Sequence, residues 1–495
     1  MTCQELVTTA QGVVHGERRE GYISYIGIPY ASANRSRFKR AGLAPTWTGV
    51  REASDPHCTE SSQVDKCLQL DVHVPSSDDT LYPVLVWVKS SSGSYHPGQL
   101  VRRGIIVVIV RHRMGPIGFL CTEEETIPGN AGIKDVVLAL RWVRDNIVAF
   151  KGNPDKVVVA GESFGAAIVE TIMLSSMSHG LFHGAVMQSG TVLSPWAFNY
   201  DTKSRMRALQ ELFNNKKVPD VFIEASIEDL VIKSERIEMP YMPFGICVEK
   251  SFKKEERVLT DAPYDMLSDG KAFHVPLIIG YNDNEAYVFA NVLKAAEVSR
   301  RLHSDMSFLL PMELNGMSTR ELKHTRDKIK EIYFKNNNYS VESLLRYHTD
   351  AYFINHIHRS ALMHSSTSSY PVYYYQFSHS GDTGVEPESG MEKFGAAHTD
   401  ELAYLFSENG RSLNGDDGKV QDILVTLWTN FVKHLNPTPH AADAVHWEAL
   451  DHKAPRVLNI GLNTEMSDYP HSTGTDMWDE IYERYYTRQK TNFLI

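Results

Sequence analysis

The pentapeptide Gly161-Glu162-Ser163-Phe164-Gly165 has the residue types and spacing of a nucleophilic serine. In a Gly-x-Ser-x-Gly turn the two glycines let a strand and a helix approach closely, so that the serine hydroxyl is exposed at the end of the strand. A valine run at 157–159 precedes the turn, and a helix-forming stretch at 166–170 follows it. The pentapeptide also occurs in loops by chance, but this strand–turn–helix context favours a nucleophile. We predict that Ser163 attacks a carbonyl carbon and that the backbone N–H of Phe164 faces the developing oxyanion.

A serine nucleophile needs a base, and the base needs an acid that orients it. His398 is the candidate base among 21 histidines, because it lies in a loop of small residues, FGAAHTDEL at 394–402. Glu285 is the candidate acid, because it follows the buried strand-like run LIIGY at 277–281. Catalytic groups of open α/β sheets gather at the carboxyl ends of the strands. The resulting chain order, serine, acid and histidine, is the order of α/β-hydrolases.

The elements that would position these residues alternate along the chain. Uninterrupted apolar runs at 84–88 and 105–110 predict strands that are buried on both faces, as in a parallel sheet. Apolar residues at three- and four-residue steps over 131–150 predict an amphipathic helix. Further strands are predicted at 185–188, 276–280 and 372–377, and a helix at 421–434. This alternation predicts a mostly parallel sheet with helices on both faces.

Two other regions deviate from the regular alternation. The first fifty residues alternate apolar and polar positions around glycines, which predicts a small antiparallel meander. The charge-rich region 216–330 has weaker strand patterns and is interpreted as an irregular helical cover over the sheet. We expect residues 1–495 to form one domain, because α/β enzymes often exceed the usual domain length.

The composition is that of a soluble globular protein, with 42% hydrophobic and 22% charged residues. Lys and Arg total 50 against 61 Asp and Glu, a net charge of −11 that disfavours nucleic acid and anionic membranes as partners. The longest aliphatic run, 105–110, is too short to span a bilayer. The N-terminus shows no signal peptide, which predicts a cytoplasmic protein, or a secreted one if that end is incomplete. The sequence does not indicate the oligomeric state.

Beyond these patterns, the chain resembles the type-B carboxylesterases, the family that includes the cholinesterases. The resemblance covers nearly the whole chain and lies in these stretches: GIPYA (27–31), CLQLDV (67–72), RMGPIGFL (113–120), PGNAGIKD (128–135), ALRWV (139–143), FKGNP (150–154), GESFG (161–165), QSG (188–190), SPWAF (194–198), VPLIIG (275–280) and the loop around His398. It implies an α/β-hydrolase fold, hydrolysis of small-molecule esters without a cofactor, and a triad of Ser163, Glu285 and His398.

The chain departs from this family at the oxyanion hole. Where the family has a His-Gly-Gly-Gly turn after a Val-Trp-Ile strand, this chain reads VWVKSSSG at 86–93. The resemblance then places Ser91 and Ser92, with Phe164, as the backbone donors. A Cβ at these positions disfavours positive φ and narrows the pocket. A loop shifted by one residue would instead place Gly93 at the tight position.

The five cysteines include no pattern of metal ligands, and no metal or other cofactor is predicted. Cys3, Cys121 and Cys247 have no motif around them and are interpreted as ordinary thiols. The resemblance implies a disulfide between Cys58 and Cys67, although in a reducing cytosol these two thiols would stay free. The loop between them lacks the tryptophan with which cholinesterases hold a quaternary ammonium group.

Two functions are therefore compatible with the sequence. The first is a serine carboxylesterase, with reduced turnover, that acts on small uncharged aliphatic or aryl esters. The second is a non-catalytic relative that uses the same site to bind a ligand or a partner. The complete triad favours the enzyme, whereas the serine-substituted turn at 90–92 favours the binding protein.

Overall fold

The computed structural model describes residues 5–32, 37–54, 68–77, 81–90, 95–237, 242–289, 310–311, 314, 317–335, 339–384, 395–406, 412–440, 445–470 and 473–492. Its strands are β1 (Leu6–Thr8), β2 (Val13–Arg19), β3 (Tyr22–Pro29), β4 (Ala31–Ser32), β5 (Gly42–Leu43), β6 (Val50–Ala53), β7 (Gln69–Pro75), β8 (Tyr82–Val88), β9 (Ile106–Val110), β10 (Gly152–Glu162), β11 (Gly184–Gln188), β12 (Leu277–Asn282), β13 (Val372–Phe377), β14 (Arg456–Ile460) and β15 (Glu465–Asp468). Its α-helices are α1 (Gly98–Arg102), α2 (Gly115–Phe119), α3 (Ala131–Asn146), α4 (Phe164–Met173), α5 (Thr202–Leu212), α6 (Asp220–Glu224), α7 (Ile227–Ser234), α8 (Pro263–Ser268), α10 (Thr319–Tyr333), α11 (Val341–Thr349), α12 (Asn355–Thr367), α13 (Leu402–Leu405), α14 (Gly415–His434) and α15 (Thr473–Asn492).

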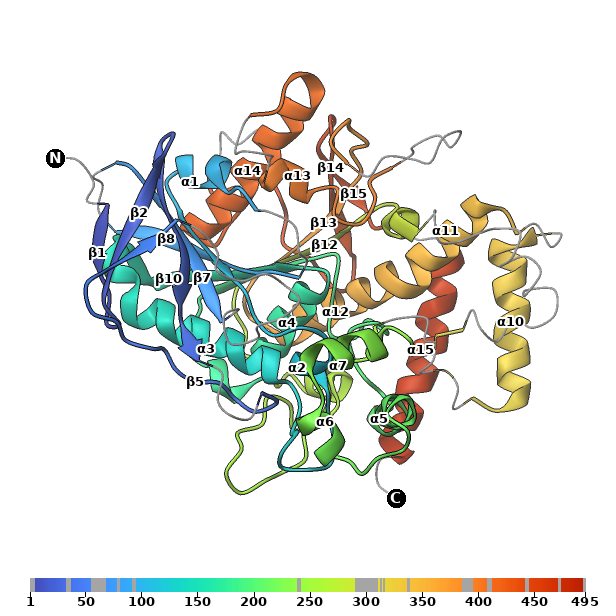
Figure 1. The fold of residues 1–495 in the computed structure, drawn as a ribbon. Coiled ribbons are helices and arrows are strands. Elements are labelled where there is room, and N and C mark those ends of the chain that lie inside the picture. The colour runs from blue at the N-terminus through green and yellow to red at the C-terminus, as the bar shows by residue number, and fades with distance from the viewer. Residues whose placement is uncertain are drawn as a thin grey trace.

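A large twisted sheet runs through the molecule, in the order β1-β2-β3-β7-β9-β8-β10-β11-β12-β13-β14-β15 (Figure 1). From β9 through β14 all neighbouring strands are parallel. The strands at the two ends pair antiparallel, which makes the sheet mixed. The predicted mostly parallel sheet is confirmed, and its parallel part contains β10, β11 and β12, which position the candidate site.

Helices cover both faces of this sheet, with α3, α4 and α12 on one face and α1 and α14 on the other (Figure 1). Because side chains alternate along a strand, each strand contributes to two cores. In β8, for example, Val86 belongs to the core under α3 and α4, whereas Trp87 belongs to the core under α14. This two-sided burial is the physical reason that the parallel strands have continuous apolar runs.

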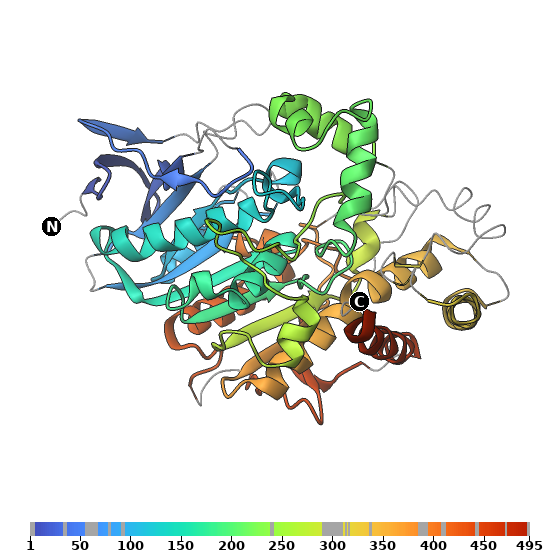
Figure 2. The same ribbon diagram turned by 90° about the horizontal axis from the view of Figure 1, so that it is seen from below.

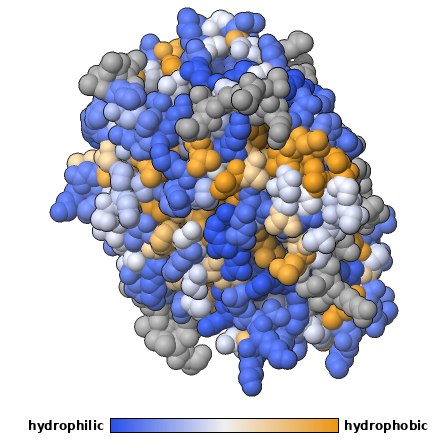
Figure 3. Space-filling view, turned by 90° about the vertical axis from the view of Figure 1, so that its left-hand side faces the viewer, coloured by the Kyte–Doolittle hydropathy of each residue, from blue (hydrophilic) through white to orange (hydrophobic). Residues whose placement is uncertain are grey.

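The N-terminal strands differ in detail from the predicted meander. β1, β2 and β3 are antiparallel as predicted, but β6 pairs with β2 in parallel, and β3 continues through β7 into the main sheet. Figure 3 shows this end of the molecule, where apolar side chains lie among a mostly hydrophilic surface. Leu6 on β1 and Val50 on β6 are half exposed.

The region 216–330 is only partly the helical cover that the sequence indicates. Its described part includes α6, α7, α8 and most of α10, and it also contains β12, a fully buried strand of the central sheet at the position where the sequence predicts a strand, 276–280. α10 and α15 lie side by side away from the sheet (Figure 2), where Lys328 and Glu480 form an ion pair of 2.7 Å.

The cysteine predictions need a correction. Cys121 and Cys247 form a disulfide, so the interpretation of both as ordinary thiols is wrong. The bond joins the segment after α2, which contains Cys121, to the segment that contains Cys247. In the latter segment, Ile246 forms an isolated parallel bridge with Phe198. Cys3 and the predicted Cys58–Cys67 pair lie outside the described residues.

Candidate active site

Ser163 lies in a strained turn between β10 and α4, as the sequence predicts. Its φ of 57° and ψ of −124° are unusual for a residue with a side chain and mark a strained backbone. The flanking glycines are required by the close approach of the backbone: a Cβ on Gly165 would lie 2.5 Å from the carbonyl oxygen of Val88. The Ser163 N–H donates to the carbonyl of Gln188 at 2.8 Å, which ties the turn to the end of β11.

The structure brings the three predicted residues together at the carboxyl end of the parallel strands. Nε2 of His398 lies 2.9 Å from Oγ of Ser163, and Nδ1 of His398 lies 2.6 Å from Oε2 of Glu285. Glu285 is fully buried, His398 is 9% exposed and Ser163 is more accessible than either. The imidazole therefore bridges an acid inside the protein and a hydroxyl at the edge of the site.

Backbone contacts hold the acid and the histidine loop in register. Oε1 of Glu285 accepts from the N–H of Asn282 at 2.9 Å, which fixes the carboxylate on the end of β12. The Asp283 side chain accepts from the N–H of Ala396 at 2.6 Å, and the His398 N–H donates to the Glu285 carbonyl at 3.3 Å. These bonds fix the histidine loop relative to β12.

Two further buried carboxyl groups lie around His398, and the sequence analysis did not assign them a role. Oε1 of Glu162 lies 3.1 Å from Nε2 of His398. That oxygen has no hydrogen-bond partner within the described residues, so the contact is electrostatic. Glu401 accepts from Gln188 at 2.9 Å and from Asn282. Glu162 lies one position before Ser163, and Glu401 lies three positions after His398. This closeness in sequence to predicted site residues is the signal that could have identified both acids.

The three carboxyl groups strongly affect the charge of His398. Burial lowers the pKa of His398, but Glu162 and Glu285 outweigh it and raise the pKa to about 9. Burial raises the pKa of Glu162 to about 6, although the nearby imidazole opposes this rise. For Glu401, burial together with the charges of Glu162 and Glu285 raises the pKa to about 8. The site thus favours a positive imidazole and keeps Glu401 protonated at neutral pH.

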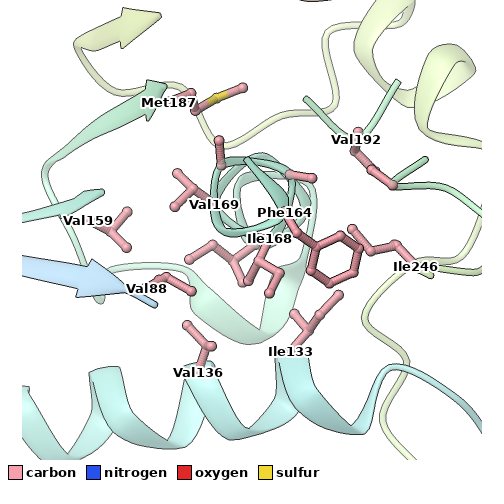
Figure 4. Close-up of a cluster of buried hydrophobic side chains, with 14 of the residues drawn as sticks. Val88, Ile133, Val136, Val159, Phe164, Ile168, Val169, Met187, Val192 and Ile246 are labelled. Atoms are coloured by element: carbon pink, nitrogen blue, oxygen red, sulfur yellow. The ribbon is translucent and has the colours of Figure 1, made fainter. Parts of the chain in front are cut away.

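The predicted oxyanion hole is only partly described. Phe164 begins α4 directly after Ser163, so its N–H lies in the first turn of the helix. Its ring points into the core towards Ile133 and Ile246 (Figure 4) and meets Phe119 edge-on at 4.8 Å. Ser91 and Ser92 lie outside the described residues, as does Gly93.

An aromatic side chain, Phe353, borders the imidazole, and a second, Trp196, packs against Phe353. The ring centroid of Phe353 lies 5.0 Å from that of His398, and the ring centroid of Trp196 lies 5.6 Å from that of Phe353. Both are nearly buried. The indole N–H of Trp196 donates to the Tyr352 carbonyl at 2.8 Å, which fixes the two rings relative to each other.

This sheet, with a serine elbow after β10, an acid after β12 and a histidine loop that comes after β13 in the chain, defines an α/β-hydrolase. The chain belongs to the carboxylesterase family, whose model matches residues 3–478.

Similarity to individual esterases supports this family assignment. The chain is 26% identical to juvenile hormone esterase of Heliothis virescens over 482 residues, which cover 86% of this chain and 85% of that protein. The solved structure of juvenile hormone esterase from Manduca sexta, with OTFP covalently attached, is similar at a TM-score of 0.86 and 26% identity, over 97% of this chain and 99% of that one. Neuroligin-2 of Mus musculus is 25% identical over 574 residues, 96% of this chain and 67% of that protein. The family and the esterase relatives identify the chain as a carboxylic ester hydrolase.

The predicted cytoplasmic location is contradicted by these findings. The chain groups with juvenile hormone esterase and other insect esterases, and it contains the Cys121–Cys247 disulfide. Disulfides of this kind form and persist in oxidising compartments and are rare in the cytosol. Among the described helices, none combines the length and the apolar character that crossing a membrane requires.

Proposed function

We propose that the protein is a serine carboxylesterase that works through an acyl-enzyme. Ser163 Oγ attacks the ester carbonyl carbon while His398 Nε2 takes the hydroxyl proton, and Glu285 orients the imidazole and stabilises its positive charge. The tetrahedral intermediate then expels the alcohol, which receives the proton from His398. Water, activated by the same histidine, releases the acid and regenerates Ser163.

One observation carries this proposal. The imidazole of His398 lies within hydrogen-bond reach of Ser163 on one nitrogen and of Glu285 on the other, at 2.9 Å and 2.6 Å. A nucleophile, a base and an orienting acid in this geometry are what acyl transfer requires.

We propose small uncharged aliphatic or aryl esters as substrates. Phe353 borders the histidine with apolar surface and is backed by Trp196, which favours uncharged groups. The carboxylates of Glu162 and Glu285 repel an anionic substrate at this edge of the sheet. Choline esters are not favoured, because the 58–67 loop of the sequence lacks the tryptophan that would bind their cation.

The test is covalent labelling of the nucleophile during turnover of a p-nitrophenyl ester. A stopped-flow burst should accompany hydrolysis, and an organophosphate should modify Ser163 alone, as read by peptide mass spectrometry. Ser163→Ala should abolish both the burst and the labelling. An adduct on another serine, or normal turnover in the alanine variant, would overturn the assignment.

The alternative is a non-catalytic protein that binds a ligand or partner at the same site. Two observations favour it: the similarity to neuroligin-2 and the serines that replace glycines at 90–92. A folded protein that binds esters without a burst and without labelling of Ser163 would support this function and exclude the esterase.

A further inference from the structure

Glu170 is a buried carboxylate that the proposed reaction does not use. It lies on α4, two turns after Ser163, and is fully buried. Both of its oxygens are occupied by donors from elsewhere in the fold. Burial disfavours its charge, but hydrogen bonds from His364, Ser360 and Thr191 outweigh this effect and lower the pKa of Glu170. The side chain is therefore a carboxylate at neutral pH.

One oxygen of Glu170 holds the loop that follows β11. Oε2 accepts from the hydroxyl of Thr191 and from the N–H of Val192 at 2.7 Å. Figure 4 shows Val192 beside α4. This loop touches the backbone of the nucleophile, because a Cβ on Gly190 would lie 2.2 Å from the Ser163 carbonyl oxygen. A shift of the loop would therefore move Ser163.

The other oxygen of Glu170 holds α12. Oε1 accepts from the hydroxyl of Ser360 and faces Nε2 of His364 at 3.1 Å. A π-helix, Asp350–Ile354, leads directly into α12 and carries Phe353, whose ring lies 5.0 Å from that of His398. The position of α12 thus determines where this aromatic ring meets the imidazole.

We propose that Glu170 is a positioning residue that fixes α4, the 189–196 loop and α12 relative to one another. In this way it sets the geometry of Ser163 against His398 and the position of the aromatic wall, the ring of Phe353 beside the imidazole. The proposal rests on the proposed function of Ser163. As a carboxylate, Glu170 accepts from the two hydroxyls, the Val192 amide and the His364 ring, and because the amide can only donate, Oε2 has to be an acceptor. A glutamine would replace one of these oxygens by an NH2 group, so the hydroxyl and ring nitrogen of that branch would have to reverse their roles, and the charge-assisted bonds of the carboxylate would be lost.

The experiment compares Glu170→Gln with Glu249→Gln. Glu249 is a matched control: it is 2% exposed, accepts from Asn130 and from the N–H of Val258, and pairs with Lys134. Both variants should lower the melting temperature. Only Glu170→Gln should reduce kcat per titrated active site, by about tenfold or more, as expected when reacting groups are displaced. It should also change the ratio of kcat/KM for p-nitrophenyl acetate and hexanoate, because the aromatic wall shifts.

A second pair of variants tests the loop branch without changing the buried charge. Thr191→Val keeps the shape but removes the hydroxyl donor, whereas Thr191→Ser keeps the hydroxyl. The valine variant should lose kcat in the same direction as Glu170→Gln, and the serine variant should match the parent. These variants remain informative if Glu170→Gln does not fold.

The outcomes separate this inference from the proposed function. If the parent turns over and Ser163 is labelled, but kcat and the chain-length ratio are unchanged in Thr191→Val and in any folded Glu170→Gln, the positioning role is wrong and the esterase stands. The same conclusion follows if Glu249→Gln changes kcat and the ratio equally. If the parent neither turns over nor becomes labelled, both proposals are overturned together.

Discussion

Oε1 of Glu162 lies 3.1 Å from Nε2 of His398, the same nitrogen that faces the serine hydroxyl. The acid precedes Ser163 by one residue, so the serine elbow itself places a negative charge beside the imidazole nitrogen that faces Ser163. This charge favours the protonated imidazole, both in the free protein and at the moment when the histidine takes the serine proton. In the free protein this charge lowers the fraction of neutral imidazole that can act as a base. In the transition state it stabilises the imidazolium, so the two effects change activity in opposite directions.

The first prediction concerns Glu162→Gln. Activity needs the neutral imidazole, so kcat/KM should rise with pH through the pKa of His398, which is raised to about 9. Removing the charge of Glu162 should lower this pKa and move the acid limb to lower pH. The plateau should also fall, by about tenfold if the charge changes the pKa by about one unit, because the imidazolium of the transition state loses stabilisation.

Steady-state pH profiles with a p-nitrophenyl ester measure both effects. Glu401→Gln is the control, because Glu401 is the weaker carboxyl influence on His398 and its own pKa is raised to about 8. This control should move the limb less. If the acid limb of the kcat/KM profile stays at the same pH in Glu162→Gln, the contact between Glu162 and His398 does not govern the titration of His398.

Much of this site follows from local sequence patterns. Continuous valines mark strands buried on two faces, and the glycines of the elbow mark a close backbone approach, so the strand before Ser163 and the helix after it are readable directly. Glu285 and His398 are readable because each lies just past a recognisable strand or in a loop of small residues. The structure places both against Ser163 at hydrogen-bond range.

Other features depend on contacts between distant parts of the chain. The cysteines of the disulfide are 126 positions apart and carry no local motif, so only the folded chain shows that they meet. The parallel pairing of β6 with β2 depends on the path of the chain around the sheet. Glu170 has the pattern of an ordinary helix residue, and its partners lie up to 194 positions away.

The second prediction concerns the Cys121–Cys247 disulfide. A bond that closes a separation of 126 residues restricts the unfolded chain strongly. Replacing both cysteines by serine should therefore lower the free energy of unfolding by about 2–5 kcal/mol. Urea unfolding measures this loss. Reductant should lower the midpoint of the parent by more than that of the double variant, in which only the predicted Cys58–Cys67 pair could still respond. A parent in which Cys121 and Cys247 react as free thiols without reductant would contradict the bond.

The third prediction concerns metal ions. The described residues contain no group of three His, Cys, Asp or Glu side chains that could hold a metal ion. In the proposed reaction Ser163 supplies the nucleophile and His398 moves the proton, so no step calls for a metal. Exhaustive dialysis against EDTA should leave the rate of ester hydrolysis unchanged. Loss of activity that zinc restores would show that this account of the reaction is incomplete.

The fourth prediction concerns the serines of the 90–92 turn. Ser90 donates to Glu162 at 3.0 Å, so its hydroxyl has a role beside the histidine and should be kept. Ser91 and Ser92 are the proposed oxyanion donors, and a Cβ would disfavour positive φ at such positions. The double variant Ser91→Gly/Ser92→Gly should raise kcat with little change in KM, because these donors act on the transition state more than on the bound ester.

The size of the rise in kcat in this double variant distinguishes a weakened oxyanion hole from a complete one. A missing donor costs about 10²–10³ in turnover, so recovery of one poorly placed donor should raise kcat by at least about tenfold. Ser90→Gly is the control: it should act through Glu162, shifting the pH profile without raising kcat. If the parent is already fast and the double variant is no faster, the hole is built elsewhere, with Gly93 as the next donor to test. If both are inert but still bind esters, the protein is a binding member of its family, and the triad geometry persists without turnover.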